Sequence, residues 1–323
     1  MTKVAVLDDW QNLARASADW SELERRASVE FFPAAIKGMD ALAARLADFD
    51  IILVMRERTA FPAALVQRLP KLKMFGLTGA RAASIDTAAM MSRGITVCYT
   101  GGGRSGTNTA ELTLGLMLAA VRRIAAGDAS IRAGRFQEGV EAGFDLAGKT
   151  LGIIGLGRIG RLMARYARAL DMRVIAWSQN LTEESARAAE ATLVSKDVLL
   201  AQADVVTLHL VLSDRTRGII GAADLKQMKP GAVLVNSSRG PLIDEKALLD
   251  ALRTGRLVAG LDVFDQEPLP ADHPLRSLPN TVLTPHLGYG TTETFQEFYR
   301  QSVENALAFL DGKPVRVMEP AGS

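Results

Sequence analysis

The fold is indicated most directly by one stretch, Lys149-Thr150-Leu151-Gly152-Ile153-Ile154-Gly155-Leu156-Gly157-Arg158-Ile159-Gly160. Its apolar first half is typical of a buried strand, and after the third spaced glycine apolar residues recur at steps of three and four, as in a helix. In such a unit Gly155 permits a tight turn, Gly157 lets the backbone approach a pyrophosphate, and Gly160 lets the helix pack close to the strand. The N–H groups at the start of the helix attract phosphate. The pattern therefore predicts dinucleotide binding.

Strand-like apolar runs alternate with helix-like segments along the whole chain. The expected strands are residues 3–8, 29–32, 50–55, 73–77, 95–98, 149–154, 173–177, 204–208, 232–235, 257–261 and 281–283. The main expected helices are residues 15–26, 39–46, 61–69, 85–91, 107–126, 245–253 and 291–310. This alternation predicts an α/β fold of parallel sheets flanked by helices.

A glycine-rich break at residues 99–106 suggests a domain boundary, because Gly101, Gly102, Gly103 and Gly106 fall within it. We expect residues 105–287 to form a dinucleotide-binding domain. The helix at 291–310 would carry the chain back to the first domain, so that residues 1–104 and 288–323 form a second, substrate-binding domain. The helix at 107–126 is apolar on most sides, which suggests burial against a neighbour and a homodimer.

Composition narrows the function classes. The 323 residues carry 38 basic and 36 acidic side chains, a net charge of +2, so no charge excess predicts a nucleic-acid or membrane partner. The single cysteine, Cys98, excludes an intramolecular disulfide and reads as a small buried hydrophobe. The three histidines are scattered, so we expect no metal site. Acidic residues at positions 8 and 9 come too early for a signal peptide, and we expect a soluble cytoplasmic protein.

Further motifs follow the glycine motif in order along the second half of the chain. They are Leu208-His209-Leu210, Thr216-Arg217-Gly218, Met228-Lys229-Pro230-Gly231-Ala232, Val235-Asn236-Ser237-Ser238-Arg239-Gly240, Leu261-Asp262-Val263-Phe264, Glu267-Pro268-Leu269 and Thr284-Pro285-His286. With them, residues 105–290 closely resemble the D-isomer-specific 2-hydroxyacid dehydrogenases, whereas residues 1–104 match more loosely. The resemblance implies a Rossmann-type dinucleotide-binding domain inserted into a flavodoxin-like substrate domain, with the active site in the cleft between them.

The resemblance also implies three catalytic residues. His286 would donate and accept the proton, Glu267 would pair with it, and Arg239 would bind the substrate carboxylate. The chemistry is sound, because a carboxylate favours the charged imidazolium and a guanidinium matches a carboxylate in two hydrogen bonds. Without the family resemblance, each residue has an ordinary alternative role. His286, which follows a proline, would be a structural residue. Arg239 would be a surface residue at a strand end, and Glu267 would be a solvated acid.

The implied cofactor-binding residues are Gly155, Gly157, Arg158, Ile159, Gly160, Ser178, Gln179, His209, Ser238, Asp262 and Gly288. Asp262 would contact the nicotinamide carboxamide; its alternative role is a helix or turn cap. NAD-specific enzymes place an acid after the second strand, where this chain reads Trp177-Ser178-Gln179-Asn180. No acid repels a 2′-phosphate there and no adjacent arginine binds one, so both NAD and NADP stay open.

The implied substrate-binding residues are Arg56, Gly79, Ala80 and Arg81. The family usually has a Gly-Val-Asp-Asn-like stretch where this chain has Gly79-Ala80-Arg81-Ala82. Arg81 adds a cation, which suggests a substrate with extra negative charge.

Together these features predict an NAD(P)-dependent D-2-hydroxyacid dehydrogenase that acts on the CH–OH group of its donor and reduces a small 2-keto acid. Glyoxylate and hydroxypyruvate are candidate substrates, and D-3-phosphoglycerate is a further one. The alternative is a dinucleotide-sensing corepressor with little turnover, since relatives of this fold have that role. Retention of Arg239, Glu267 and His286 favours the enzyme.

Overall fold

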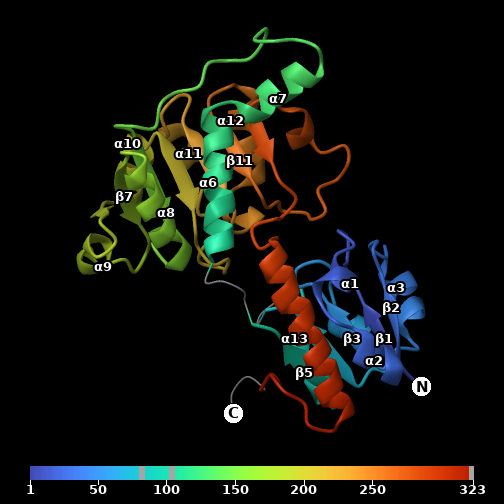
Figure 1. Cartoon of the computed structure of the whole chain (residues 1–323). Helices are drawn as coiled ribbons and strands as arrows, with labels where there is room; N and C mark the ends of the chain where they lie inside the picture. Colours follow the sequence, from blue (N-terminus) through green and yellow to red (C-terminus); the bar gives the residue numbers. More distant parts are fainter. Residues whose placement is uncertain (80–83, 102–105, 320–323) are drawn as a thin grey trace. The chain divides into compact units, whose positions relative to one another are not determined.

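The computed structural model describes residues 1–79, 84–101 and 106–319. The chain divides into two compact units. Unit 1 comprises Met1–Arg104 and Thr291–Ser323, and unit 2 comprises Ser105–Gly290. In Figure 1 the two pieces of unit 1 have the colours of the two ends of the chain, blue to cyan and red.

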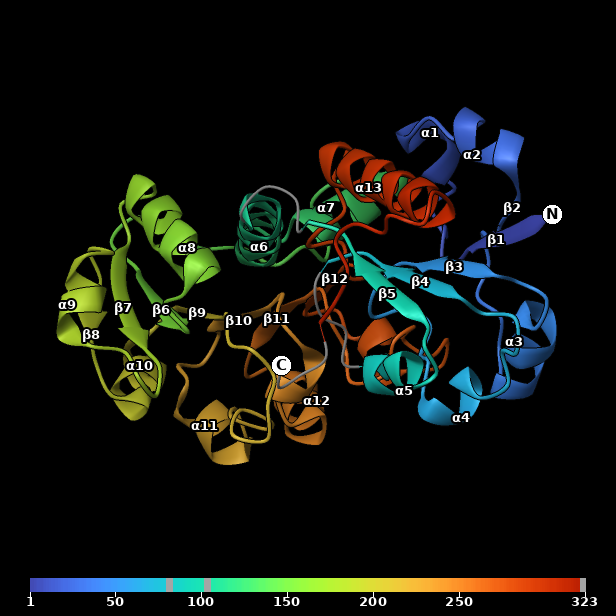
Figure 2. The same ribbon diagram turned by 90° about the horizontal axis from the view of Figure 1, so that it is seen from below.

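Unit 1 is built on one parallel sheet with the strand order β2-β1-β3-β4-β5. Its strands are β1 (Thr2–Val6), β2 (Ala27–Phe31), β3 (Ile51–Val54), β4 (Met74–Leu77) and β5 (Thr96–Tyr99). Figure 2 shows helices on both faces. One face carries α1 (Ala14–Ser17), α2 (Ser21–Arg26) and α13 (Thr292–Leu310), and the other carries α3 (Met39–Leu46), α4 (Ala63–Val66) and α5 (Thr87–Ser92).

The strands of unit 1 are apolar because both faces of the sheet are covered. All four residues of β3 and of β4 are buried. Alternate residues such as Ala5, Ile52 and Phe75 belong to one apolar core with the side chains of α3, α4 and α5. Continuous apolar runs of this kind are the signature of a parallel sheet between two helical layers.

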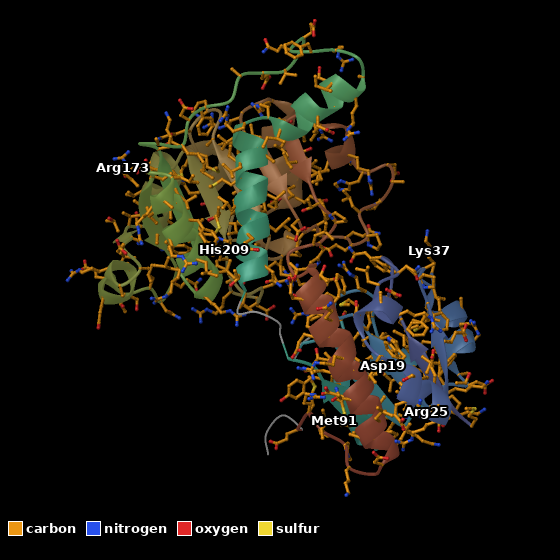
Figure 3. All side chains as sticks on the ribbon, in the orientation of Figure 1. Asp19, Arg25, Lys37, Met91, Arg173 and His209 are labelled. Carbon is orange, nitrogen blue, oxygen red and sulfur yellow. The ribbon has the colours of Figure 1, made fainter. Side chains whose placement is uncertain are left out.

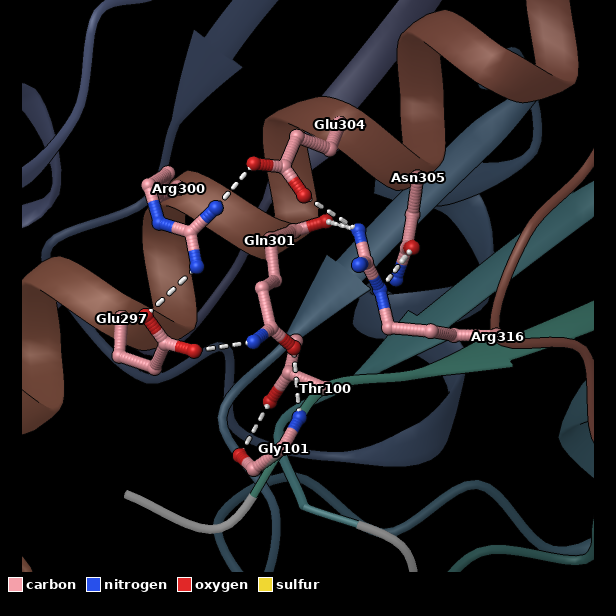
Figure 4. Close-up of polar contacts among 8 residues, drawn as sticks. All are labelled: Thr100, Gly101, Glu297, Arg300, Gln301, Glu304, Asn305 and Arg316. Carbon is pink, nitrogen blue, oxygen red and sulfur yellow. Dashed lines mark hydrogen bonds and ion pairs between the residues drawn. The ribbon is translucent and has the colours of Figure 1, made fainter. Parts of the chain in front are cut away.

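The C-terminal segment completes unit 1 through a network of hydrogen bonds at the end of β5 (Figure 4). The Asn305 side chain donates to the carbonyl of Tyr99 at 3.0 Å and accepts from Arg316 Nε at 2.8 Å. The Tyr99 amide donates to the carbonyl of Arg316 at 3.0 Å, and the Gly101 amide donates to Gln301 Oε1 at 2.6 Å. Helix α13 and the segment after it are therefore bonded to the sheet that begins at residue 2.

Unit 2 is built on a seven-stranded parallel sheet with the order β12-β11-β10-β9-β6-β7-β8. Its strands are β6 (Thr150–Ile154), β7 (Arg173–Trp177), β8 (Thr192–Leu193), β9 (Val205–Leu208), β10 (Val233–Asn236), β11 (Val258–Leu261) and β12 (Thr281–Leu283). The chain runs outward from β6 to β8 and returns on the other side of β6 as β9. The strand order thus reverses between β6 and β9, which is where open α/β sheets bind ligands.

Helices cover both faces of this sheet as well (Figure 2). One face carries α6 (Thr107–Val121) and α8 (Arg158–Ala169), and the other carries α10 (Lys196–Gln202), α11 (Ala222–Gln227) and α12 (Glu245–Arg253). The remaining elements are α7 (Ile124–Arg132), α9 (Glu183–Arg187), η1 (Gly240–Leu242) and η2 (Pro274–Ser277). The α/β class with helix-flanked parallel sheets is confirmed.

Two expected helices are each broken into two. Residues 15–26 form α1 and α2, and residues 107–126 form α6 and the start of α7. Arg123 interrupts the second because its φ of +55° is left-handed and cannot continue a right-handed helix. Part of the apolar surface of α6 is covered by α8 and by β10, β11 and β12 of its own unit.

Within the described residues, none of the helices is at once long and apolar enough to cross a bilayer. No group of three or more His, Cys, Asp or Glu side chains in this part of the chain is arranged to hold a metal ion.

Candidate active site

The three motif glycines have the three different surroundings that the sequence pattern predicts. Gly155 has a φ of +101°, and a Cβ there would lie 2.7 Å from the carbonyl oxygen of His209. A Cβ on Gly160 would overlap the carbonyl of Gly155, so α8 packs against the strand end only with glycine at that position. In the described part of the chain nothing lies within 4 Å of the Cβ position of Gly157. The turn therefore leaves open space at the second glycine, at the N-terminus of α8, and this fits a pyrophosphate.

Three neighbouring strands end at this turn. Ile154 pairs with Trp177 on one side and with Leu208 on the other. The Gly155 amide donates to the carbonyl of Trp177, and the His209 amide donates to that of Ile154, both at 2.8 Å. Gly155, and the residues that follow β7 and β9, therefore lie together at the carboxyl edge of the sheet.

His209, marked in Figure 3, has an unusual environment. Both ring nitrogens are buried, and neither has a hydrogen-bond partner among the residues that the structure describes. Burial lowers the pKa of the imidazole to about 3, so the ring is neutral at ordinary pH. A neutral imidazole carries one donor and one acceptor, and leaving both unpaired is unfavourable. The ring fits a site that a polar ligand group completes.

The loop after β10 is held by its own polar groups. Asn236 is buried, and its side chain accepts from the Ser238 amide at 3.0 Å and donates to the carbonyl of Arg239 at 2.8 Å. Ser238 Oγ donates to the carbonyl of Leu208 at 2.7 Å, which ties this loop to the end of β9. The half-buried guanidinium of Arg239 donates to the carbonyl of Ser238 at 2.7 Å. These bonds fix the backbone from which Arg239 projects.

His286 and Glu267 form a close pair. Nδ1 of His286 lies 2.6 Å from Oε2 of Glu267, and the two side chains are 14% and 19% exposed. The other carboxylate oxygen, Oε1, accepts from the amide of Phe264 at 3.0 Å. One oxygen of Glu267 is thus held by backbone while the other orients the imidazole. The predicted pairing of these two residues is present in the geometry.

Asp262 holds the loop that carries His286. Its carboxylate is fully buried; Oδ1 accepts from Thr284 Oγ1 at 2.6 Å and from the Leu287 amide at 2.7 Å. Oδ2 accepts from the Gly288 amide at 2.8 Å. The carbonyl of Asp262 also accepts from the amide of His286, whose φ is +54°. Burial raises the pKa of Asp262, although these hydrogen bonds oppose the shift. In this structure the carboxylate acts as the turn cap that the sequence left as an alternative.

The substrate-binding candidates of unit 1 follow β3 and β4. The guanidinium of Arg56 lies against Gly79, where a Cβ would overlap it. The amide of Gly79 donates to Thr100 Oγ1 at 3.0 Å, and the amide of Arg56 donates to Thr78 Oγ1 at 3.1 Å. Ala80 and Arg81 lie outside the described residues.

Asp8, which lies two residues beyond β1, was not predicted as a site residue. It is 6% exposed and has a φ of +63°. Oδ1 accepts from Thr59 Oγ1 at 2.7 Å, and Oδ2 has no partner within the described ranges. Burial raises the pKa of this carboxyl to about 6. The available signal was an acid at the end of an apolar run, at the edge where parallel sheets bind ligands.

Comparisons with known proteins show which proteins this chain is similar to. Residues 114–288 match the family model for the NAD binding domain of D-isomer specific 2-hydroxyacid dehydrogenase. A glyoxylate reductase of Korarchaeum cryptofilum is 36% identical over 86% of this chain and 82% of its own length. A D-3-phosphoglycerate dehydrogenase of Archaeoglobus fulgidus is 38% identical over 82% of this chain, which spans only 50% of that protein's length. The crystal structure of a putative D-3-phosphoglycerate dehydrogenase oxidoreductase from Ralstonia solanacearum superposes with a TM-score of 0.91 at 39% identity, covering 99% of this chain and 97% of that one.

Proposed function

Because this chain belongs to the D-isomer specific 2-hydroxyacid dehydrogenase family, we propose that it is an NAD(P)-dependent D-2-hydroxyacid dehydrogenase that reduces a small 2-keto acid. The observation that carries the proposal is the 2.6 Å contact between His286 Nδ1 and Glu267 Oε2, with Glu267 anchored on the amide of Phe264. His273 and Glu245 also form a histidine–carboxylate pair, but their atoms lie 3.2 Å apart. The shorter contact at His286, with its carboxylate anchored on backbone, is the arrangement that suits a general acid–base pair.

The reduction of a 2-keto acid requires a hydride, a proton for the carbonyl oxygen and a cation for the carboxylate. A bound nicotinamide dinucleotide supplies the hydride. His286 supplies the proton from Nε2, the ring nitrogen opposite the one that Glu267 binds, and Glu267 stabilises the imidazolium before the transfer. Arg239 binds the carboxylate through its planar guanidinium and polarises the keto oxygen.

The residues at the carboxyl edge of unit 2 fit the dinucleotide. The open space at Gly157 suits the pyrophosphate, with Arg158 and Ile159 in the first turn of α8 beside it. Ser178 and Gln179 follow β7 where the adenosine ribose would bind, and the unpaired ring of His209 would complete its hydrogen bonds on the cofactor. Ser238 and Gly288 belong to loops tied to β9 and to Asp262, and they would border the nicotinamide half. Unit 2 is accordingly the proposed dinucleotide-binding domain and unit 1 the substrate-binding domain.

The proposed substrate is glyoxylate, hydroxypyruvate or a similar acid. The glyoxylate reductase of Korarchaeum cryptofilum aligns along 82% of its length, which favours small 2-keto acids. The proposed substrate contacts are Arg56, Gly79, Ala80 and Arg81. The amide of Gly79 would exchange its hydrogen bond to Thr100 for one to the substrate. A second anionic group, as in D-3-phosphoglycerate, is the feature that Arg81 would recognise.

The test is oxidation of NADH and of NADPH against a panel of 2-keto acids that includes glyoxylate and hydroxypyruvate. The proposal expects turnover on at least one acid and loss of that turnover in His286→Ala. Cofactor binding with negligible turnover on every acid would instead support the alternative, a dinucleotide-sensing corepressor.

Homodimerisation and a cytoplasmic location stay predictions. Three large apolar side chains on or just after α7 support a subunit contact, since Ile124, Ile131 and Phe136 are 56%, 58% and 69% exposed. Sedimentation velocity at micromolar concentration tests the dimer, and a monomer there would contradict it.

A further inference from the structure

Gln179, in the segment after β7, contacts a residue that is distant from it in the sequence. This is the position from which NAD-specific enzymes contact the ribose 2′-hydroxyl with an acid. Here Gln179 is exposed, and its Oε1 accepts from Arg215 NH2 at 2.5 Å. Its Nε2 lies 3.5 Å from the carbonyl of Arg215 and donates to it. The segment after β7 contains no arginine that could bind a 2′-phosphate. Arg215, 36 residues further along the chain, lies beside that segment.

Arg215 lies in a turn that is stabilised by hydrogen bonds between its own residues. Thr216 Oγ1 accepts from the Ser213 amide at 2.8 Å and donates to the carbonyl of Val211 at 2.7 Å. The Arg217 amide donates to the carbonyl of Ser213 at 2.9 Å. The turn follows β9, and Gln179 follows β7, so the two residues reach each other across the end of β6. That strand end carries the glycine turn.

Arg215 gives this pair its positive charge, and the exposed Asp214 precedes it in the same turn. The guanidinium of Arg215 is engaged by a neutral amide and is exposed to solvent. The segment after β7 reads Ser178-Gln179-Asn180, whose side chains donate hydrogen bonds and carry no charge. A guanidinium matches a phosphate in two parallel hydrogen bonds, and the Gln179 amide can add a donor once its oxygen has released the arginine.

We propose that Arg215, positioned by Gln179, binds the 2′-phosphate of NADP(H) and makes this chain select NADP(H) over NAD(H). The inference rests on the proposed dinucleotide site of unit 2. It assigns the specificity to a residue of the loop after β9 in addition to the segment after β7.

The experiment measures binding to the whole chain without any 2-keto acid, by isothermal titration calorimetry. The probes are adenosine 2′,5′-bisphosphate and AMP, which differ only in the 2′-phosphate, followed by NADPH and NADH. We expect the wild type to bind the bisphosphate at least about 10-fold more tightly than AMP, as one charge-assisted contact warrants.

Arg215→Gln removes the charge and retains a polar side chain. We expect it to weaken bisphosphate and NADPH binding about 10- to 100-fold and to change AMP and NADH binding less than about threefold. Arg253→Gln is the matched control. Arg253 is the last residue of α12 and precedes the start of β11, so it lies near the amino ends of the strands, whereas the proposed dinucleotide site lies at their carboxyl ends. Circular dichroism melts check that both variants are folded.

Two results would overturn the inference: equal binding of the bisphosphate and AMP by the wild type, or an Arg215→Gln variant that loses NADH and NADPH equally. Its failure differs from failure of the proposed function. Turnover of a 2-keto acid without 2′-phosphate discrimination refutes only the role of Arg215. Arg215-dependent NADPH binding without turnover on any acid refutes only the dehydrogenase.

Discussion

Oε2 of Glu267 lies 2.6 Å from Nδ1 of His286, and the other oxygen of the same carboxylate is bound by the amide of Phe264. The acid therefore has a fixed orientation before any substrate arrives. An imidazole oriented in this way presents its second nitrogen in one direction, which is what proton transfer to a bound carbonyl requires.

Glu267→Gln tests this arrangement. The amide is nearly isosteric, and its oxygen can accept from either Phe264 or His286, but the negative charge that stabilises the imidazolium is gone. We expect kcat for 2-keto acid reduction to fall by about 100-fold, within the usual range for general acid catalysis. The dissociation constant of the cofactor should change little. A variant with wild-type kcat would show that Glu267 does not support the proton donor.

Asp262→Asn probes the loop that carries His286. The amide group would face at least one backbone N–H, because three donors now point at the two carboxylate oxygens. We expect a loss of about 1–3 kcal/mol in the free energy of unfolding, the usual effect of an unsatisfied buried group. Denaturant unfolding measures it, with the exposed Asp250→Asn as the control. Equal stability of the two variants would contradict the capping role.

Asp8 predicts a pH dependence of stability. Its pKa in the folded chain is about 6 against 3.8 for the free side chain, so folding favours the protonated form. This stabilisation is complete below about pH 3.8 and is lost as pH rises through about 6, a change of up to roughly 3 kcal/mol.

Asp8→Asn removes the titration, while its amide oxygen can still accept from Thr59. The variant should therefore melt higher than the wild type at pH 7.5 and close to it at pH 4.5. A difference that is independent of pH would show that the carboxyl does not titrate in this range. Asp145→Asn, at an exposed position, provides the control.

Asn305→Ala tests how the C-terminal segment is held in unit 1. The side chain is fully buried and bridges the carbonyl of Tyr99 and Nε of Arg316. Its removal leaves a buried acceptor and a charged donor without this partner, and we expect a loss of about 2–3 kcal/mol. Asn180→Ala, at an exposed position, should cost less than about 0.5 kcal/mol. Similar melting temperatures for the two variants would contradict the assignment.

Much of the fold could be predicted because its strands are short, apolar and fully covered. The expected helices at 39–46 and 245–253 have the bounds of α3 and α12, and Asp244 caps the second as its position before an apolar pattern indicates. Strand β8 was not predicted, since two residues paired with β7 form no periodic run. The break at Arg123 depends on a left-handed backbone that arginine itself does not favour.

The candidate site could be predicted where the motif itself contains the contact. Gly155 and Gly160 lie in one turn, so their spacing describes their packing. The contacts of Asp262 could not be predicted, because its carboxylate is bound by residues up to 26 positions later. Likewise, nothing near Gln179 in the sequence indicates Arg215, which reaches it only through the parallel order of β7, β6 and β9.

The proton-donor role of His286 is tested most directly by a single-turnover reaction. The reduced cofactor that binds more tightly, NADPH or NADH, is first bound to an excess of enzyme. This complex is mixed with the best 2-keto acid in a stopped-flow instrument. The decay of nicotinamide absorbance is then compared between the wild type and His286→Gln. We expect a decay at least about 100-fold slower in the variant, with an unchanged dissociation constant for the cofactor. A variant that oxidises the bound cofactor at the wild-type rate would show that another group protonates the substrate.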